Sequence, residues 1–151
     1  MEKLLISACL MGENCKYNGG NNALPPETLA ALRETYRLIP VCPEVAGGLP
    51  VPREPSERQG ARVVSRSGRD VTAEYRRGAE TALRLAERFG CRKALLKERS
   101  PSCGNGKIYD GSFHGRLIPG NGVTAELLMI QKLEVFGELS APLQATDAAC
   151  K

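Results

Sequence analysis

The feature that most constrains the fold is the alternation of short apolar segments with segments of helical pattern. Four apolar runs of strand length lie at residues 4–8, 38–42, 93–97 and 133–136. Helices are predicted between them, one opening at residues 25–27 and the others at about 71–89 and 123–132. This order predicts an α/β fold, with a doubly wound, mainly parallel sheet of about four strands flanked by helices.

The longest helix and the longest loop have the clearest local signals. Asp70 is expected to cap the helix at 71–89, and Gly90 to end it. Tyr75 belongs to the apolar face of that helix, which recurs with helical period. Residues 43–55 contain four prolines and two glycines, which predicts a rigid, non-helical loop. Long ordered loops in small domains are usually functional.

The chain has 151 residues, the size of one ordinary domain. We therefore predict a single α/β domain over residues 1–139. Residues 140–151 are short and polar, and we expect them to form a flexible C-terminal tail.

Composition and charge narrow the possible partners and the cellular compartment. The net charge of +4 is spread along the chain, and aromatic residues make up 5%, which argues against a stacking platform for nucleic acid. No run approaches the ~18 apolar residues of a membrane span. Residues 4–11 lack a signal peptide's cleavage pattern and have no basic region before them beyond Lys3. We expect a cytoplasmic protein, whose six cysteines do not form three structural disulfides.

Three cysteines follow the first three predicted strands. Cys9 comes just after the first strand, Cys42 ends the second, and Cys103 lies in the loop after the third. Ligands of open parallel sheets bind outside the carboxyl ends of the strands. The three thiols are therefore expected to project toward one rim and to share a site.

The other three cysteines fall elsewhere. Cys91 precedes the third strand, so we expect a small buried hydrophobe near the opposite rim. Cys150 lies in the tail. Cys15 lies in the first loop and could reach the site, where it would compete for a fourth ligand position.

The donor set limits the chemistry without selecting one answer. There is one histidine, His114, and no Cys-x-x-Cys pair, so a zinc finger is a poor fit. Three thiolates suit either an open zinc site or a 4Fe-4S cluster with one iron that has no protein ligand. The chain could accordingly be an iron–sulfur enzyme, a non-catalytic zinc- or nucleotide-binding module, or an enzyme that uses one activated thiolate.

Several short motifs follow one another along the chain: residues 6–10 (ISACL), 17–20 (YNGG), 40–45 (PVCPEV), 48–50 (GLP), 52–53 (PR), 100–104 (SPSCG), 108–111 (IYDG) and 122–125 (GVTA). In this order they resemble the motifs of the thiouracil desulfidase family, formerly a bacterial domain of unknown function. The resemblance extends over about residues 3–138, which is nearly the whole chain.

The resemblance implies a fold, a cofactor and a reaction. It implies that domain 1–139 binds a 4Fe-4S cluster through Cys9, Cys42 and Cys103, the cysteines that topology brings to one rim. The open iron would bind the sulfur of a small thiolated substrate, and water would replace that sulfur without net redox change. Thiolated tRNA stays open as a substrate.

The resemblance also assigns roles to two further residues. Glu44 matches the family's catalytic acidic residue and would activate the water; otherwise it caps a loop. Ser100 would contact the substrate or relay a proton; otherwise it is a turn hydroxyl. Arg53 could bind an anion, or pair with Glu54 or Glu57.

Overall fold

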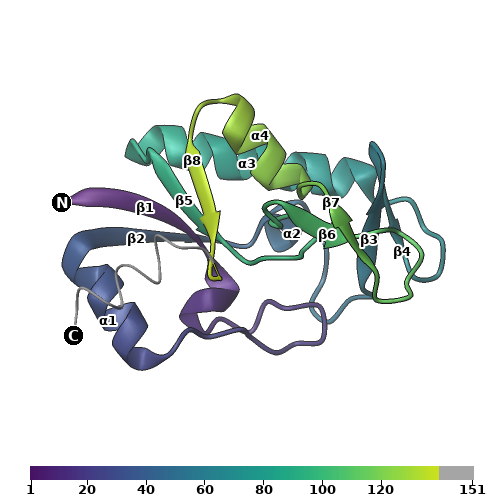
Figure 1. Ribbon diagram of the computed structural model, residues 1–151, viewed down its shortest axis with the longest axis horizontal. Helices are drawn as coiled ribbons and strands as arrows, with labels where there is room; N and C mark the ends of the chain where they lie inside the picture. The colour runs from purple at the N-terminus through teal and green to yellow at the C-terminus, as the bar shows by residue number, and fades with distance from the viewer. Residues whose placement is uncertain (140–151) are drawn as a thin grey trace.

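A four-stranded parallel sheet forms the centre of the molecule, with strand order β2-β1-β5-β8 (Figure 1). Its strands are β1 (Glu2–Ser7), β2 (Tyr36–Val41), β5 (Lys93–Leu96) and β8 (Glu134–Gly137). The computed structural model describes residues 1–139, so the predicted tail and Cys150 lie outside the described residues. The predicted parallel sheet is confirmed.

Helices cover both faces of the sheet, as a doubly wound fold requires. α1 (Pro26–Thr35) lies on one face, and α3 (Thr72–Phe89) and α4 (Val123–Ile130) lie on the other (Figure 1). Alternation along β1 explains this arrangement: Leu4 and Ile6 pack toward α1, while Leu5 packs toward α3 and α4. Each of these three side chains is fully buried. The short apolar runs of the sequence therefore correspond to strands buried on both faces.

The edge position of β2 explains how the sheet accommodates a proline. Pro40 lies within β2, opposite Ile6 of β1. Among the described strands, β2 pairs only with β1, so Pro40 lies on an edge strand, where proline is tolerated in a sheet.

Two small hairpins lie beyond the carboxyl ends of the sheet strands, far from the N-terminus (Figure 1). They pair β3 (Ser56–Gln59) with β4 (Arg62–Ser65), and β6 (Lys107–Tyr109) with β7 (Leu117–Pro119). Of these four segments, only Arg62–Ser65, with two adjacent valines, has a sequence that suggests a small strand. The others have three or four residues each, too few to show an alternating pattern.

Two local predictions need correction. The loop at 43–55 is not wholly non-helical, because α2 (Pro43–Ala46) forms one turn there. Proline is well tolerated at the first position of a helix, where its missing donor has no partner to lose. Asp70 is not the N-cap of α3; that position is Val71, and Asp70 Oδ1 instead accepts the backbone N–H of Thr72 at 2.9 Å.

The strand order identifies where a ligand should bind. The chain leaves β1 for β2 on one side and later enters β5 on the other, so the connections diverge at β1. Such a switch point opens a crevice at the carboxyl ends of the strands. In the part of the chain that the structure describes, no helix is long and apolar enough to cross a bilayer.

Candidate active site

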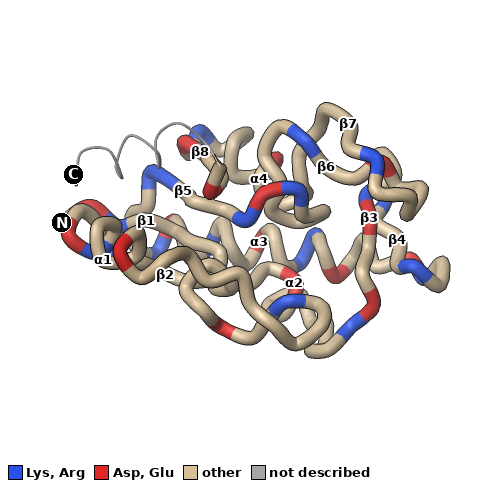
Figure 2. The backbone as a smooth tube through the Cα atoms, turned by 60° about the horizontal axis from the view of Figure 1, so that its bottom comes forward, with Lys and Arg blue, Asp and Glu red and all other residues tan. Residues whose placement is uncertain are grey.

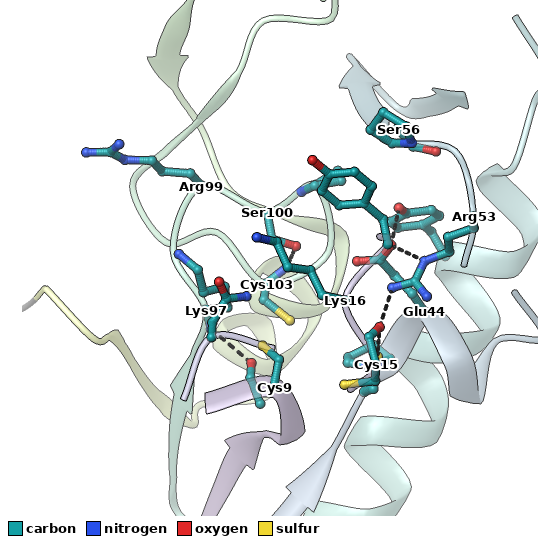
Figure 3. Close-up of a pocket in the computed structure, with 18 of the residues that line it drawn as sticks. Cys9, Cys15, Lys16, Glu44, Arg53, Ser56, Lys97, Arg99, Ser100 and Cys103 are labelled. Atoms are coloured by element: carbon teal, nitrogen blue, oxygen red, sulfur yellow. Dashed lines mark hydrogen bonds and ion pairs between the residues drawn. The ribbon is translucent and has the colours of Figure 1, made fainter. Parts of the chain in front are cut away.

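A cavity of about 550 Å³ opens at this crevice (Figure 3). All five residues that the sequence proposes for the site line it: Cys9, Cys42, Glu44, Ser100 and Cys103. They come from the segments that follow β1, β2 and β5. The topology therefore brings together residues up to about ninety positions apart in the sequence.

Each of the three cysteines is placed by the end of a strand. Cys9 lies in a 3-10 turn, η1 (Ala8–Met11), directly after β1. Cys42 follows β2 and is the N-cap residue of α2. Cys103 lies in the loop after β5 and is buried. Figure 3 shows the sulfur atoms of Cys9 and Cys103 on the same side of the cavity, and their charges would interact if both were ionised.

The remaining described cysteines differ in their relation to the cavity. Cys91 is buried in the core at the start of β5 and does not line the cavity. Cys15 lines it, and its carbonyl oxygen accepts a long hydrogen bond from Cys42 Sγ at 3.8 Å. Cys15 therefore lies beside one of the three proposed ligands.

Burial controls the protonation of these thiols. It raises the pKa of Cys9, and it raises the pKa of Cys103 to about 12, although a hydrogen bond with Ser7 opposes the shift. Burial and the neighbouring Cys42 raise the pKa of Cys15 to about 12. Cys9, Cys15 and Cys103 are therefore neutral thiols at pH 7 without a metal, and binding a metal at Cys9 and Cys103 would release their protons.

The three cysteine thiols come from separate segments, which bears on whether they would bind one metal ion or a multi-metal cluster. Within residues 1–139, no three His, Cys, Asp or Glu side chains converge closely enough to hold a single metal ion. Thiols that border one cavity from separate segments suit a polynuclear cluster, in which each cysteine binds a different iron.

Close packing of α2 on α3 positions Glu44. A Cβ atom at Gly47 would lie 2.9 Å from the carbonyl carbon of Glu74, and one at Gly78 would lie 2.7 Å from that of Pro43. Both separations are shorter than side chains tolerate, so two glycines allow the backbones of the two helices to touch. Glu44, in the first turn of α2, is thereby brought directly over α3.

Two donors hold one oxygen of the Glu44 carboxylate. Arg53 Nε donates to Glu44 Oε1 at 3.1 Å, and the Tyr75 hydroxyl donates to the same atom at 2.7 Å (Figure 3). Arg53 therefore pairs with Glu44, and not with Glu54 or Glu57 as the sequence allows. Glu57 instead accepts backbone N–H groups of the loop after β6.

The Ser100 hydroxyl organises the loop that carries Cys103. Its Oγ accepts the backbone N–H groups of Ser102 and Cys103, each at 3.1 Å. These two bonds define a local turn, which is the structural role that the sequence left open. Within residues 1–139 the Ser100 hydroxyl accepts these bonds but donates to no acceptor, so its proton can form a further bond in the cavity.

Sequence reasoning missed Tyr75 as part of the site. It lies in the apolar stripe of α3 and is only 1% exposed, so its pattern indicates packing alone. The available signal was its hydroxyl, because a buried tyrosine hydroxyl usually requires a partner. Its partner, Glu44, is 31 residues away in the sequence.

Comparisons with known proteins find matches over most of the chain. The family model described as 2-thiouracil desulfurase matches residues 4–139. A protein of Bacillus subtilis (strain 168), described as uncharacterized protein YbbK, is 41% identical over 145 residues, or 89% of this chain and 95% of the relative. A solved structure, described as 4Fe-4S-dependent thiouracil desulfidase TudS, is 48% identical, covers the whole of both chains and superimposes with a TM-score of 0.91.

Proposed function

The chain belongs to the 2-thiouracil desulfurase family, and from this premise we propose that it is a 4Fe-4S-dependent desulfidase. Its reaction is the hydrolytic removal of sulfur from a thiolated pyrimidine such as 2-thiouracil. Water supplies the oxygen of the new carbonyl, and the sulfur leaves as hydrogen sulfide, so no oxidant or reductant is consumed. The observation that carries the proposal is that Cys9, Cys42, Cys103 and Glu44 all border the same cavity.

Cys9, Cys42 and Cys103 would hold the cluster. When bound, the cluster supplies a Lewis-acidic iron that attracts thiocarbonyl sulfur and makes the adjacent carbon easier to attack. Cys103 is buried, and Cys9 and Cys42 are partly buried; this burial suits the role, because exclusion of water protects a cluster and strengthens its electrostatic effect.

Glu44 is the general base in this proposal. Its carboxylate lies at the cavity wall, two residues after Cys42, and forms an ion pair with Arg53 at 3.1 Å. It would take a proton from the attacking water, a step that typically contributes about 10²–10⁴-fold to rate. Ser100 would donate a hydrogen bond to the substrate ring while its oxygen holds the Cys103 turn.

The substrate is a small molecule in this proposal. A cavity of about 550 Å³ lies within the size range of ordinary ligand sites. Figure 2 shows Lys and Arg positions interspersed with Asp and Glu along the chain, without the single basic stripe that favours nucleic acid. Thiolated tRNA is therefore the less favoured substrate.

We also place the protein in the cytoplasm. All five cysteines within residues 1–139 are free thiols, and a reducing compartment keeps them so.

Metal analysis with cysteine variants tests the proposal. After anaerobic reconstitution, we expect about four iron and four sulfide per chain, and sulfide release from 2-thiouracil. Alanine at Cys9, Cys42 or Cys103 should lower iron content and abolish release, whereas Cys91→Ala is the matched control and should retain both. Stoichiometric zinc without iron would support the binding module instead, and turnover without any metal would support a bare thiolate.

A further inference from the structure

Glu44 is restrained through one oxygen only. Arg53 and Tyr75 both donate to Oε1, and Oε2 accepts no hydrogen bond from any residue in the range 1–139. We propose that Arg53 and Tyr75 are positioning residues, which fix the carboxylate through Oε1 and leave Oε2 to accept the proton of the attacking water. This inference rests on the proposed function, in which Glu44 is the general base.

The contacts of Arg53 tie its guanidinium to the protein itself. Its Nε donates to Glu44, its Nη1 to the carbonyl of Pro50 at 3.1 Å, and its Nη2 to the carbonyl of Cys15 at 2.8 Å. The side chain is only 7% exposed. Each of the three guanidinium nitrogens thus donates to an acceptor of the protein. The guanidinium thereby joins α2, the loop at 47–55 and the Cys15 loop in one fixed geometry.

Tyr75 restrains the same oxygen from its position in α3. Its ring packs against Val63 and Val71 in a small buried cluster, so the hydroxyl has little freedom to move. Burial and the nearby Glu44 carboxylate raise the pKa of Tyr75 well above its usual value, so the hydroxyl stays protonated and donates. At 2.7 Å, the bond to Glu44 has the length of a strong, charge-assisted hydrogen bond.

Two donors on one oxygen also fix the plane of the carboxylate. One hydrogen bond would leave the group free to rotate about it, but donors from Arg53 and Tyr75 come from different elements and define an orientation. General-base catalysis requires that orientation, because the base must lie within hydrogen-bond reach of the proton it accepts. Neither residue reaches the reacting atoms in this account, so both act through Glu44.

The test begins with Tyr75→Phe, which removes the hydroxyl and retains the packed ring. We expect kcat to fall by roughly tenfold to a hundredfold, as part of the contribution of a well-placed base, with KM and iron content within about twofold of the wild type. Tyr36→Phe is the matched control, because the Tyr36 hydroxyl contacts Lys93 at the amino end of the sheet. It should leave kcat unchanged.

A second pair of variants tests Arg53. Arg53→Lys keeps the positive charge and should retain more activity than Arg53→Gln. Arg53→Gln loses both the charge and the planar guanidinium with its several donors. Both proteins should be compared at equal iron content. Equal loss in the two variants would overturn the role of Arg53 charge in holding Glu44.

A double-mutant cycle separates positioning from a merely structural effect. When Glu44→Gln has already removed the carboxylate, the Tyr75 hydroxyl no longer has a base to orient. We therefore expect Tyr75→Phe to change kcat by less than a further twofold on that background. A repeat of the full loss on that background would overturn the inference, as would wild-type kcat in Tyr75→Phe. The proposed function fails separately: a fully loaded wild-type protein that releases no sulfide would reject it before any variant is compared.

Discussion

Gly78→Ala tests whether contact between α2 and α3 positions the site. Gly78 lies inside α3, where alanine normally stabilises a helix by about 1 kcal/mol relative to glycine. An isolated helix would therefore gain stability from this change. In the folded protein, the added Cβ would overlap the Pro43 carbonyl group, with its carbon 2.7 Å away, about 0.7 Å inside the 3.4 Å at which ordinary contact begins.

The clash should outweigh the gain in helix propensity. The obstacle is backbone, which cannot rotate away as a flexible side chain could, and overpacking in such places costs roughly 1–3 kcal/mol or more. We expect a net loss of about 1–2 kcal/mol in the free energy of unfolding. If α2 shifts to relieve the overlap, Glu44 and Cys42 shift with it. A displacement near 1 Å can cost on the order of a hundredfold in rate.

Anaerobic urea unfolding of the cluster-free protein measures the first effect, and sulfide release per bound cluster measures the second. Arg76→Ala is the control, since Arg76 is exposed on the same helix and should change stability by less than about 0.5 kcal/mol. A Gly78→Ala protein that is more stable than wild type and fully active would show that α2 does not press on α3. The reasoning about Glu44 placement would then be wrong.

Three further changes probe the Cys103 loop and the start of α3. Thr124→Val removes the 2.8 Å bond between the fully buried hydroxyls of Ser102 and Thr124, so urea unfolding should show a loss of about 1–3 kcal/mol; an unchanged midpoint would contradict that bond. Ser100→Ala removes the acceptor of two backbone N–H groups, and iron analysis should show lower cluster occupancy, whereas full occupancy would refute its role in the turn. A hydrogen bond from Thr72 lowers the pKa of Asp70, so its stabilising effect is present above the unfolded value of about 3.9 and is lost as pH falls through the folded value. Asp70→Asn should therefore reduce the difference in urea midpoint between pH 6 and pH 3, and an unchanged difference would refute this.

The sheet and its long helices were predictable because their signals are local. Continuous apolar runs such as Leu4 to Ile6 identify strands that are buried on both faces. In α3, the helical period and Gly90 at its end are properties of the segment itself. The parallel order then places the segments after β1, β2 and β5 at one rim, which is why the cavity could be expected from sequence.

The parts that were not predicted depend on tertiary contact. The short β3, β6 and β7 strands acquire their conformation from pairing, which no pattern of three or four residues specifies. Contact between Tyr75 and Glu44 requires α2 to lie against α3, and this follows from two glycines whose importance appears only when the helices meet. Arg53 has three acceptors from separate segments, and sequence alone does not select them.

The most direct test of the central claim follows the oxygen. The anaerobically reconstituted protein is given 2-thiouracil in water enriched in oxygen-18, and the uracil product and released sulfide are quantified together. The account predicts one labelled oxygen in each uracil and one sulfide per uracil, with no added oxidant or reductant. Unlabelled uracil, a requirement for an electron donor, or no sulfide from a protein with full cluster content would contradict it.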